Sequence, residues 1–456
     1  MISKSRGVHV TVITLGCSKN LVDAECMTRF LLDDSFELVT DISSAEVIVI
    51  NTCGFIESAK KEAIDTILEA AEYKKPRGNA DFIVVTGCLS QRYPDDILMD
   101  LPEVDAVIGT NHYSEIGQVI EGLYNGDKEG CRRRVSMPGG LSHIRKDRIV
   151  STSSYAWLKI AEGCSNSCAY CAIPAIRGKY VSRLMEDIID EAKIISGNGI
   201  SEIILTAQDT TNYGIDVYAE RMLPTLLKEL SKIKEISAIR IMYAYMEGIT
   251  DQLLEEMVCN PKVLHYLDIP VQHGDDRVLS RMGRRDSVEL ITERLNKIRQ
   301  KIPDIVIRST VMVGFPGETE DEFESLLKNV QKWKFDRLGC FIYSAEENTR
   351  AFLLADQIEM SVAQDRYNRI MEAQQVISLH INQERIGSIV TVTIDSISDD
   401  GIFYSGRSYA EAPEVDPKLL VLATDQDLLI GNQYEVRLVD CSPYEMTGVT
   451  INEFTE

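Results

Sequence analysis

Short apolar runs alternate with amphipathic stretches along the first 125 residues. The runs read "VHVTVITL", "EVIVIN" and "DFIVVT", and the stretches 21–32 and 56–73 between them have a helical period. Apolar strands separated by helices are typical of a parallel sheet that is covered on both faces. We therefore predict a doubly wound, flavodoxin-like parallel sheet domain over residues 7–125.

A longer series of strand and helix patterns runs from residue 155 to residue 385. Helical patterns, for example 184–196, 287–301 and 319–332, separate six candidate strands at 156–160, 202–206, 238–243, 266–270, 305–312 and 337–343. "DSVE" at 286–289 and "TEDE" at 319–322 have the pattern of capping boxes and predict where two of these helices begin. Repeated βα units predict a TIM-like barrel, and six units rather than eight predict an open (β/α)6 barrel. A long helix that carries apolar Val362, Ile370, Val376, Ile377 and Ile381 is expected to close the domain.

The apolar period changes to two in the last segment, residues 386–456. The runs "SIVTVTIDSI", "IFYSGRS", "YEVRLVD" and "GVTINE" predict a small β-barrel, so the whole chain is expected to be an α/β multidomain protein. Residues 126–154 contain Gly, Pro and Ser with little apolar period, which is typical of a linker. Seven Lys/Arg and three Asp/Glu give this stretch a charge of +4. It is therefore interpreted either as a solvated linker or as a docking strip for an acidic surface.

Composition narrows the class of protein. Hydrophobic residues make up 44% of the 456 residues, and no window reaches the roughly 18 apolar residues of a membrane span, so no membrane partner is expected. The net charge of −23 argues against a general nucleic-acid binder. Eleven cysteines without an export signal predict a reducing, cytoplasmic location, where clustered cysteines are more often a metal site than disulfides.

Three of these cysteines lie within the stretch "AEGCSNSCAYCAIP". Cys164, Cys168 and Cys171 are spaced C-x3-C-x2-C and directly follow the first predicted barrel strand, at the end where barrel enzymes carry their chemistry. Closely spaced thiolates select iron–sulfur clusters or zinc. A zinc site would need a fourth Cys or His, and the next candidates are as distant as Cys259 and His265. An iron–sulfur cluster with one open iron, able to bind a substrate or cofactor, is the better prediction.

A second triplet is dispersed along the N-terminal domain. Cys17, Cys53 and Cys88 each follow one of the three apolar runs, at intervals of 36 and 35 residues. Parallel strands end at the same edge of a sheet, so we expect these three thiols to converge and to hold a second cluster with an open iron. The remaining cysteines, at 26, 131, 259, 340 and 441, show no such phase and are interpreted as ordinary thiols.

The C-x3-C-x2-C spacing, with aromatic Tyr170 before the last cysteine, resembles the radical S-adenosylmethionine enzymes. The resemblance implies that S-adenosylmethionine binds the open iron and is cleaved by one electron to give an adenosyl radical. Later strand ends then supply candidate cofactor contacts. These are Gln208 and Asp209 after "EIILTA", Gln272 after "YLDIPV", and Gly314 and Gly317 in the turn "VGFPGE", where the backbone could approach the adenosine.

The two triplets together with the two barrels resemble the methylthiotransferases over nearly the whole chain. "TLGCSKNLVDAE", "NTCGFIESAKKEAID" and "LKIAEGCSNSCAYCAIPAIRGKYVSR" are similar to the motifs of this family, and the last segment is similar to its TRAM domain. Members that modify tRNA typically have Gln-Met-Asn after the first cysteine. Ser18-Lys19-Asn20 here favours the members that modify a ribosomal protein. Ala24 stands where Ser is common, without an evident chemical consequence.

The resemblance implies two 4Fe–4S clusters, S-adenosyl-L-methionine and a low-potential electron donor. One cluster would generate the radical, and the other would present sulfur that is methylated and transferred. The implied reaction is methylthiolation of the β-carbon of an aspartate in the twelfth protein of the small ribosomal subunit. Three alternatives remain: a tRNA adenosine methylthiotransferase, an iron–sulfur electron carrier, and a nucleic-acid-binding scaffold with structural zinc.

The charge of the TRAM-like segment bears on the partner. Residues 387–456 contain thirteen Asp/Glu and three Lys/Arg, a net charge of −10. Such a surface should repel tRNA and steer a basic ribosomal protein toward the barrel mouth, unless the charge serves solubility only. The carboxylates expected to do this are Asp395, Asp399, Asp400, Glu411, Glu414 and Asp416.

Overall fold

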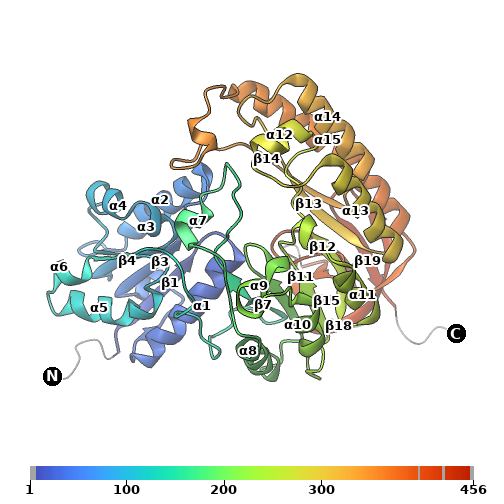
Figure 1. Cartoon of the computed structure of the whole chain (residues 1–456). Coiled ribbons are helices and arrows are strands. Elements are labelled where there is room, and N and C mark those ends of the chain that lie inside the picture. Colours follow the sequence, from blue (N-terminus) through green and yellow to red (C-terminus); the bar gives the residue numbers. More distant parts are fainter. Residues whose placement is uncertain (1–6, 399–400, 424–426, 452–456) are drawn as a thin grey trace.

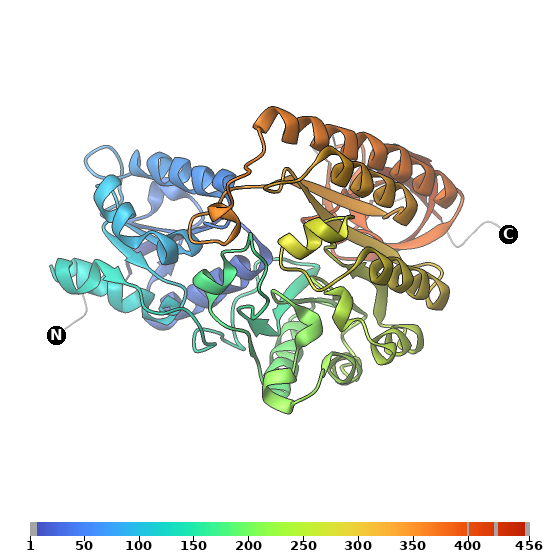
Figure 2. The same ribbon diagram turned by 45° about the horizontal axis from the view of Figure 1, so that its top comes forward.

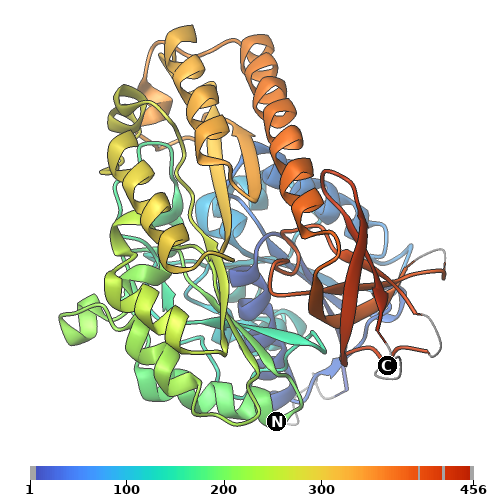
Figure 3. The same ribbon diagram turned by 90° about the vertical axis from the view of Figure 1, so that its right-hand side faces the viewer.

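Three structural units follow one another along the chain in the computed structural model, which describes residues 7–398, 401–423 and 427–451. The N-terminal unit lies beside a larger central unit, with the segment around α7 between them (Figure 1). The turned view keeps these two units side by side (Figure 2). The C-terminal barrel packs near the end of the long helix α15 (Figure 3). The site described below lies where the first two units meet.

The N-terminal unit is a parallel sheet of six strands in the order β2-β1-β3-β4-β5-β6. Its strands are β1 (His9–Thr14), β2 (Glu37–Leu38), β3 (Val47–Thr52), β4 (Phe82–Gly87), β5 (Ala106–Ile108) and β6 (Arg133–Arg134). Its helices are α1 (Ser18–Asp33), α2 (Glu57–Ala71), α3 (Cys88–Arg92), α4 (Pro94–Asp100), α5 (Ile116–Tyr124) and α6 (Lys128–Cys131). The order of the first five strands is that of flavodoxin, which confirms the predicted fold.

Alternate residues of the central strand β3 pack on opposite faces of this sheet. Val47 and Val49 belong to the core with α1 and α5, whereas Ile48 and Ile50 belong to the core with α2. Every residue of β3 is buried, as a strand covered on both faces requires. The short strands β2, β5 and β6 were not predicted, because two or three residues are too few to show a period.

The segment 126–154 is not a solvated linker. It begins with α6 and with β6, which adds the sixth strand to the sheet. Further along, His143 and Arg148 are 2% and 4% exposed. Arg148 pairs with Glu25 and, at 2.6 Å, with Glu191, so it joins the first two units. Arg148 is therefore not available to a partner, whereas the docking strip stays a prediction for the exposed Arg132 and Arg133.

The central unit is an open parallel sheet in the order β14-β13-β12-β11-β10-β7. Its strands are β7 (Tyr155–Lys159), β10 (Glu202–Thr206), β11 (Ala238–Ile241), β12 (Val263–Asp268), β13 (Val306–Val313) and β14 (Arg337–Ile342). A separate two-stranded antiparallel sheet is formed by β8 (Ala161–Glu162) and β9 (Val181–Ser182). Its helices are α7 (Ile173–Arg177), α8 (Met185–Gly197), α9 (Ile215–Tyr218), α10 (Leu223–Leu230), α11 (Asp251–Cys259), α12 (Asp276–Arg281), α13 (Val288–Lys301), α14 (Glu320–Trp333) and α15 (Met360–Arg385). The six predicted strands are confirmed, and so is the open (β/α)6 architecture.

Two predicted details of this unit differ from the structure. The strand expected at 266–270 is β12, which ends at Asp268 because Pro270 has no backbone N–H to donate to a neighbouring strand. The capping box expected at 286–289 is not formed, since Asp286 pairs with Arg284 and the Ser287 hydroxyl caps α13 instead. The capping box between Thr319 and Glu322 is present at the start of α14.

Helix α15 closes the central unit and leads to the C-terminal barrel. Its buried residues are Ala363, Arg366, Ile370, Gln374, Ser378 and Asn382, whereas Val376 and Val362 are exposed. The barrel is closed by β15 (Ile389–Ile397), β16 (Tyr404–Arg407), β17 (Leu419–Leu422), β19 (Met446–Thr450) and β18 (Gln433–Cys441), in that order. This confirms the predicted small barrel. In the described ranges, no helix combines the length and the apolar character that a bilayer span demands.

Acidic residues of the C-terminal barrel do not form the free surface expected from its charge. Asp399 and Asp400 lie outside the described residues. The other four contact cations or hydroxyls of the same chain: Asp395 lies 2.8 Å from Arg407, Glu411 3.2 Å from Arg385, Asp416 3.4 Å from Arg308, and Glu414 accepts a hydrogen bond from the Tyr155 hydroxyl. The predicted steering role is therefore corrected for Asp395, Glu411 and Asp416, whose charges are compensated by arginines of the same chain, whereas Glu414 is exposed and bonded to neutral donors.

Neutralising one of these carboxylates should destabilise the protein rather than slow its association with a partner. Glu411 is 2% exposed and lies between Arg337, at 3.4 Å, and Arg385. Glu411→Gln should lower the free energy of unfolding by about 3 kcal/mol, since breaking a buried ion pair leaves its partner charges uncompensated. Urea unfolding would measure this against Glu445→Gln, a change at an exposed position of the same barrel. Equal midpoints for the two variants would contradict a stabilising role for this buried pairing.

Candidate metal and cofactor site

The second cysteine triplet lies at one edge of the N-terminal sheet. Cys17 precedes α1, Cys53 follows β3, and Cys88 opens α3 directly after β4. Thr14 pairs in register with Asn51, and Thr52 with Gly87, so the neighbouring strands end level with one another. The predicted convergence is therefore present in the structure.

Electrostatic coupling also shows that these thiols are close together. Burial raises the pKa of Cys53 to about 12, and the nearby thiols of Cys88 and Cys17 add to the increase. Burial likewise raises the pKa of Cys88, although the Arg177 guanidinium opposes it. Thiols that resist ionisation in each other's presence become thiolates when a cation binds between them.

Two glycines allow the loops to come this close. A Cβ on Gly16 would lie 2.8 Å from the Cβ of Cys53, and Gly16 has a φ of +93°. A Cβ on Gly54 would lie 2.7 Å from the Cα of Leu89, next to Cys88. Any larger residue at either position would push the cysteine loops apart.

Asn20 ties the three loops together, and sequence reasoning did not identify this role. Its Nδ2 donates to the carbonyl oxygens of Leu15 and Thr52, at 3.0 Å each, so it holds the segments that lead to Cys17 and Cys53. Its Oδ1 lies 3.6 Å from the Cys88 sulfur. The only hint in the sequence was its place three residues after Cys17, within the first turn of a helix.

Arg177 joins this edge to the central unit. Its guanidinium donates to Asn20 Oδ1 and lies 3.5 Å from the Cys88 sulfur, while its other nitrogen contacts Asp23, at 2.5 Å, and Glu162, at 3.1 Å. Arg177 ends α7, which begins two residues after Cys171. One side chain therefore reaches from the segment of the first triplet to a thiol of the second.

Both carboxylates of this network, Asp23 and Glu162, are paired with Lys159 and Arg177. Burial would raise the pKa of Asp23, but Lys159 and Arg177 hold it well below its usual range. The same two cations lower the pKa of Glu162 to about 2 against the effect of burial. Asp23, Glu162 and His143 lie close enough to hold a metal ion, yet two cations already neutralise the carboxylates. We interpret the group as a buried ionic junction between the units.

The first cysteine triplet lies on the loop between β8 and α7. Burial raises the pKa of Cys171 to about 12, and the neighbouring Cys168 and Cys164 contribute. The backbone of Ala169 holds this loop on the barrel, since its N–H donates to Met282 and its carbonyl accepts from Ala351. The three thiols therefore lie together at the end of the barrel where β7 terminates.

Neither triplet has the dimensions of a single zinc site. In the described part of the chain, neither set of three sulfur atoms lies within 4.8 Å of one another. Zinc at about 2.3 Å from each thiolate would hold tetrahedral sulfurs about 3.8 Å apart. A set of three thiolates fits a cluster in which each thiolate binds a different iron atom. The donor set is therefore suited to iron–sulfur clusters and weighs against a zinc scaffold.

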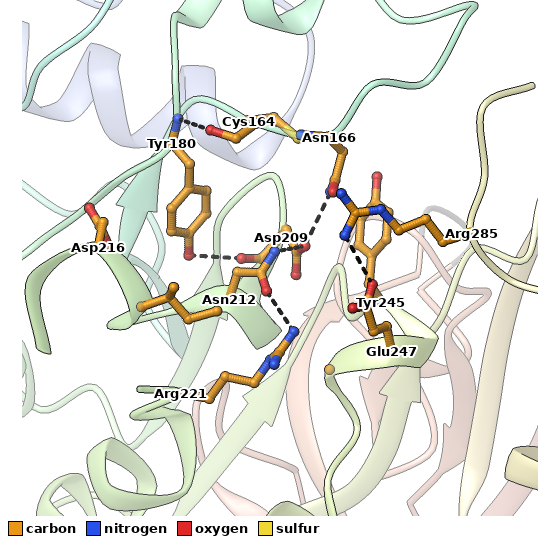
Figure 4. A pocket seen from close by; sticks show the side chains of 13 residues that line it. Cys164, Asn166, Tyr180, Asp209, Asn212, Asp216, Arg221, Tyr245, Glu247 and Arg285 are labelled. Carbon is orange, nitrogen blue, oxygen red and sulfur yellow. Dashed lines mark hydrogen bonds and ion pairs between the residues drawn. The ribbon is translucent and has the colours of Figure 1, made fainter. Parts of the chain in front are cut away.

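A pocket of about 300 Å³ opens beside Cys164 (Figure 4). Asp209 lies in its wall, where its side chain accepts hydrogen bonds from Asn166 and Asn212 and its carbonyl accepts one from the Tyr180 hydroxyl. Burial raises the pKa of Asp209. Arg221, Arg285, Tyr245 and Glu247 also line the pocket, and sequence reasoning identified none of them because they come from loops without a motif.

The other predicted cofactor contacts do not line this pocket. The Gln208 amide donates to Glu162 Oε1 at 2.6 Å. Gln272 has a φ of +69°, and its backbone pairs with β13 near the rim of the barrel. Gly314 lines a second cavity of about 850 Å³ between α2 and α15, and the Gly317 N–H donates to the carbonyl of Asp356, in the loop before α15. Of the five residues, the structure places only Asp209 beside a cysteine of the first triplet.

Comparisons with known proteins agree with this architecture. The chain matches the uncharacterized protein family UPF0004 over residues 9–109, the Radical SAM superfamily over 158–330 and the TRAM domain over 386–451. It is 46% identical to the ribosomal protein uS12 methylthiotransferase RimO of Acetivibrio thermocellus, over 97% of this chain and 98% of that protein. Identity to RimO of Caldicellulosiruptor saccharolyticus is 48%, over 97% and 100%.

A solved structure shares the fold. The radical S-adenosylmethionine methyltransferase TsrM of Kitasatospora setae, with cobalamin and a [4Fe-4S] cluster bound, superposes with a TM-score of 0.56. The match covers 84% of this chain and 80% of that one at 13% identity. At this identity the likeness shows the fold alone.

Proposed function

Because the chain belongs to the RimO family of ribosomal protein uS12 methylthiotransferases, we propose that it adds a methylthio group to the β-carbon of an aspartate in uS12. uS12 is the twelfth protein of the small ribosomal subunit. The observation that carries this proposal is the contact across one domain interface between Arg177, in the helix that follows the first triplet, and Cys88 of the second. A protein that only carried electrons would need neither the second triplet nor the pocket beside the first.

Iron–sulfur chemistry and S-adenosylmethionine follow from membership of the family. We propose that Cys164, Cys168 and Cys171 hold one 4Fe–4S cluster. Cys17, Cys53 and Cys88 would hold the other. The two sets of three free thiols, one at the edge of the N-terminal sheet and one on the loop after β8, support this assignment.

The bound cofactors would supply an electron for cleaving S-adenosylmethionine, a radical able to take hydrogen from an unactivated C–H bond, and sulfur for transfer. The chain's own residues position these groups. Asp209, Asn166 and Tyr180 shape a polar wall beside Cys164, where an amino group and hydroxyls of the cofactor could donate hydrogen bonds. Outside this pocket, Gln208 and Gln272 would contribute from the ends of β10 and β12, and Gly314 and Gly317 from the turn after β13.

We propose the following division of the chain: a methylthiotransferase domain at 7–125, a connecting segment at 126–154, a radical core at 155–385 and a TRAM domain at 386–456. The reaction requires a low-potential electron donor. A substrate that is part of the ribosome, together with the free cysteines, supports a cytoplasmic location. The net charge of −23 favours a basic protein substrate over tRNA.

Mass spectrometry of uS12 after reaction tests the proposal directly. The anaerobically reconstituted protein, given S-adenosylmethionine and a reductant, should add the mass of one methylthio group to uS12. Unmodified tRNA under the same conditions serves as the competing substrate. Methylthiolation of tRNA but not of uS12 would replace this proposal with the tRNA-modifying alternative.

A further inference from the structure

Lys19 reaches from the N-terminal unit onto the rim of the radical barrel. It is the second residue of α1, two positions after Cys17, and it is 7% exposed. Its Nζ lies 2.9 Å from the centre of the Tyr243 ring, which follows β11. The neighbouring Ser18 hydroxyl lies 3.2 Å from that of Thr206, at the end of β10. The lysine therefore lies where the segment of Cys17 meets the carboxyl ends of barrel strands β10 and β11.

The ammonium group of Lys19 has no anionic partner among the described residues. No carboxylate oxygen lies within 4.0 Å of it, and no hydrogen bond from it is present in the described part of the chain. Asp268 is near enough to interact electrostatically, but its oxygens bind Arg308, at 3.3 Å, and the backbone N–H of Tyr243, at 3.2 Å. Lys159, the other deeply buried lysine at this junction, contacts two carboxylates.

The cation–π contact with the Tyr243 ring offsets only part of the cost of burying the Lys19 ammonium, since no carboxylate pairs with it. Such a charge is retained where an anion arrives during function. On the basis of the proposed function, we propose that Lys19 binds the side-chain carboxylate of the substrate aspartate and selects aspartate over its amide. The β-carbon is bonded directly to the carboxylate carbon, so a cation that fixes the carboxylate also fixes the reacting carbon.

The carboxylate of S-adenosylmethionine is a less suitable partner for Lys19. That carboxylate would lie beside Cys164, where Arg221 and Arg285 line the pocket and offer cations of their own. Lys19 instead belongs to the segment of the opposite triplet, through Cys17. A group bound by Lys19 would therefore be held next to the segment whose Cys17 would bind the second cluster.

The test compares two peptides from the target loop of uS12, one with the native aspartate and one with asparagine at that position. Fluorescence anisotropy with the reconstituted protein and S-adenosylmethionine should show that the wild type binds the aspartate peptide about 30-fold or more tightly than the asparagine peptide. Lys19→Met should bind both equally and weakly. Lys19→Arg, which keeps the positive charge, should retain part of the preference.

The ratio of the two affinities is measured within each preparation, so incomplete cluster loading of a variant does not affect it. Lys61→Met, at an exposed lysine of α2, is the matched control and should keep the full preference. A Lys19→Met variant that still prefers aspartate would overturn the inference. So would a parallel loss of S-adenosylmethionine binding, measured by equilibrium dialysis, since it would assign Lys19 to the cofactor. Failure of the wild type to modify uS12 would instead contradict the proposed function.

Discussion

Replacing Cys164, Cys168 and Cys171 together by alanine should abolish cleavage of S-adenosylmethionine and remove about half of the bound iron, since one of two clusters of equal size would be lost. The pocket beside Cys164 would then have no metal to hold the cofactor or to supply the electron. Iron and acid-labile sulfide assays and detection of 5′-deoxyadenosine would measure the two effects. We expect the nucleoside to fall to background.

The matched control is the triple alanine variant of Cys17, Cys53 and Cys88. It should lose a similar amount of iron and all methylthio transfer, yet retain measurable cleavage of S-adenosylmethionine, because it leaves the pocket beside Cys164 intact. This contrast separates the roles of the two triplets. If the first variant still cleaved S-adenosylmethionine, the assignment of its cysteines would be wrong.

The sequence predicted the convergence of the second triplet because strand ends obey a general rule. Cys17, Cys53 and Cys88 follow three apolar runs, and adjacent parallel strands end at one edge of a sheet. To apply this rule, only the apolar period of each run and the number of residues between the runs must be known. For the same reason the six strands of the radical barrel could be placed to within a few residues.

The contacts between the units could not be predicted in this way. Asn20, Arg177 and Lys19 act where the N-terminal unit docks on the barrel, and a linear pattern does not contain the relative placement of two domains. Arg148 shows the same limit, because its stretch appeared solvated in composition yet pairs with Glu25 and Glu191 across the junction.

Charge counts were misleading for a related reason. The net charge of the C-terminal barrel is real, but Glu411 and Asp416 have arginine partners on the long helix and the central barrel. A segment's own composition does not show which of its charges are neutralised by other segments. Only the buried or exposed state of each carboxylate decides whether it can steer a partner.

Replacing Arg177 by methionine should weaken the junction between the two units and, with it, the binding of the second cluster. The change leaves Asp23 and Glu162, which are 0% and 3% exposed, to share the single cation Lys159. Losing one member of a buried ionic network costs about 3–5 kcal/mol. Arg177→Lys should recover only part of this, because an ammonium cannot contact the carboxylates and Asn20 at the same time. Arg77→Met, at an exposed arginine paired with Glu72, is the control.

The deficit of Arg177→Met should depend on pH in a direction set by Asp23. In the wild type the pKa of this carboxyl is lowered, so the stability it contributes is present above its unfolded pKa of about 3.9 and is lost as the pH falls below that value. Without Arg177, the effect of burial on Asp23 is less well offset. The pKa of this carboxyl in the folded variant then rises above its unfolded value, so the variant takes up protons on folding. Urea unfolding from pH 7 to pH 4 should therefore show the difference between wild type and variant shrinking as the pH falls. A difference that stays constant over this range would mean that Arg177 stabilises the junction by packing and not by its charge.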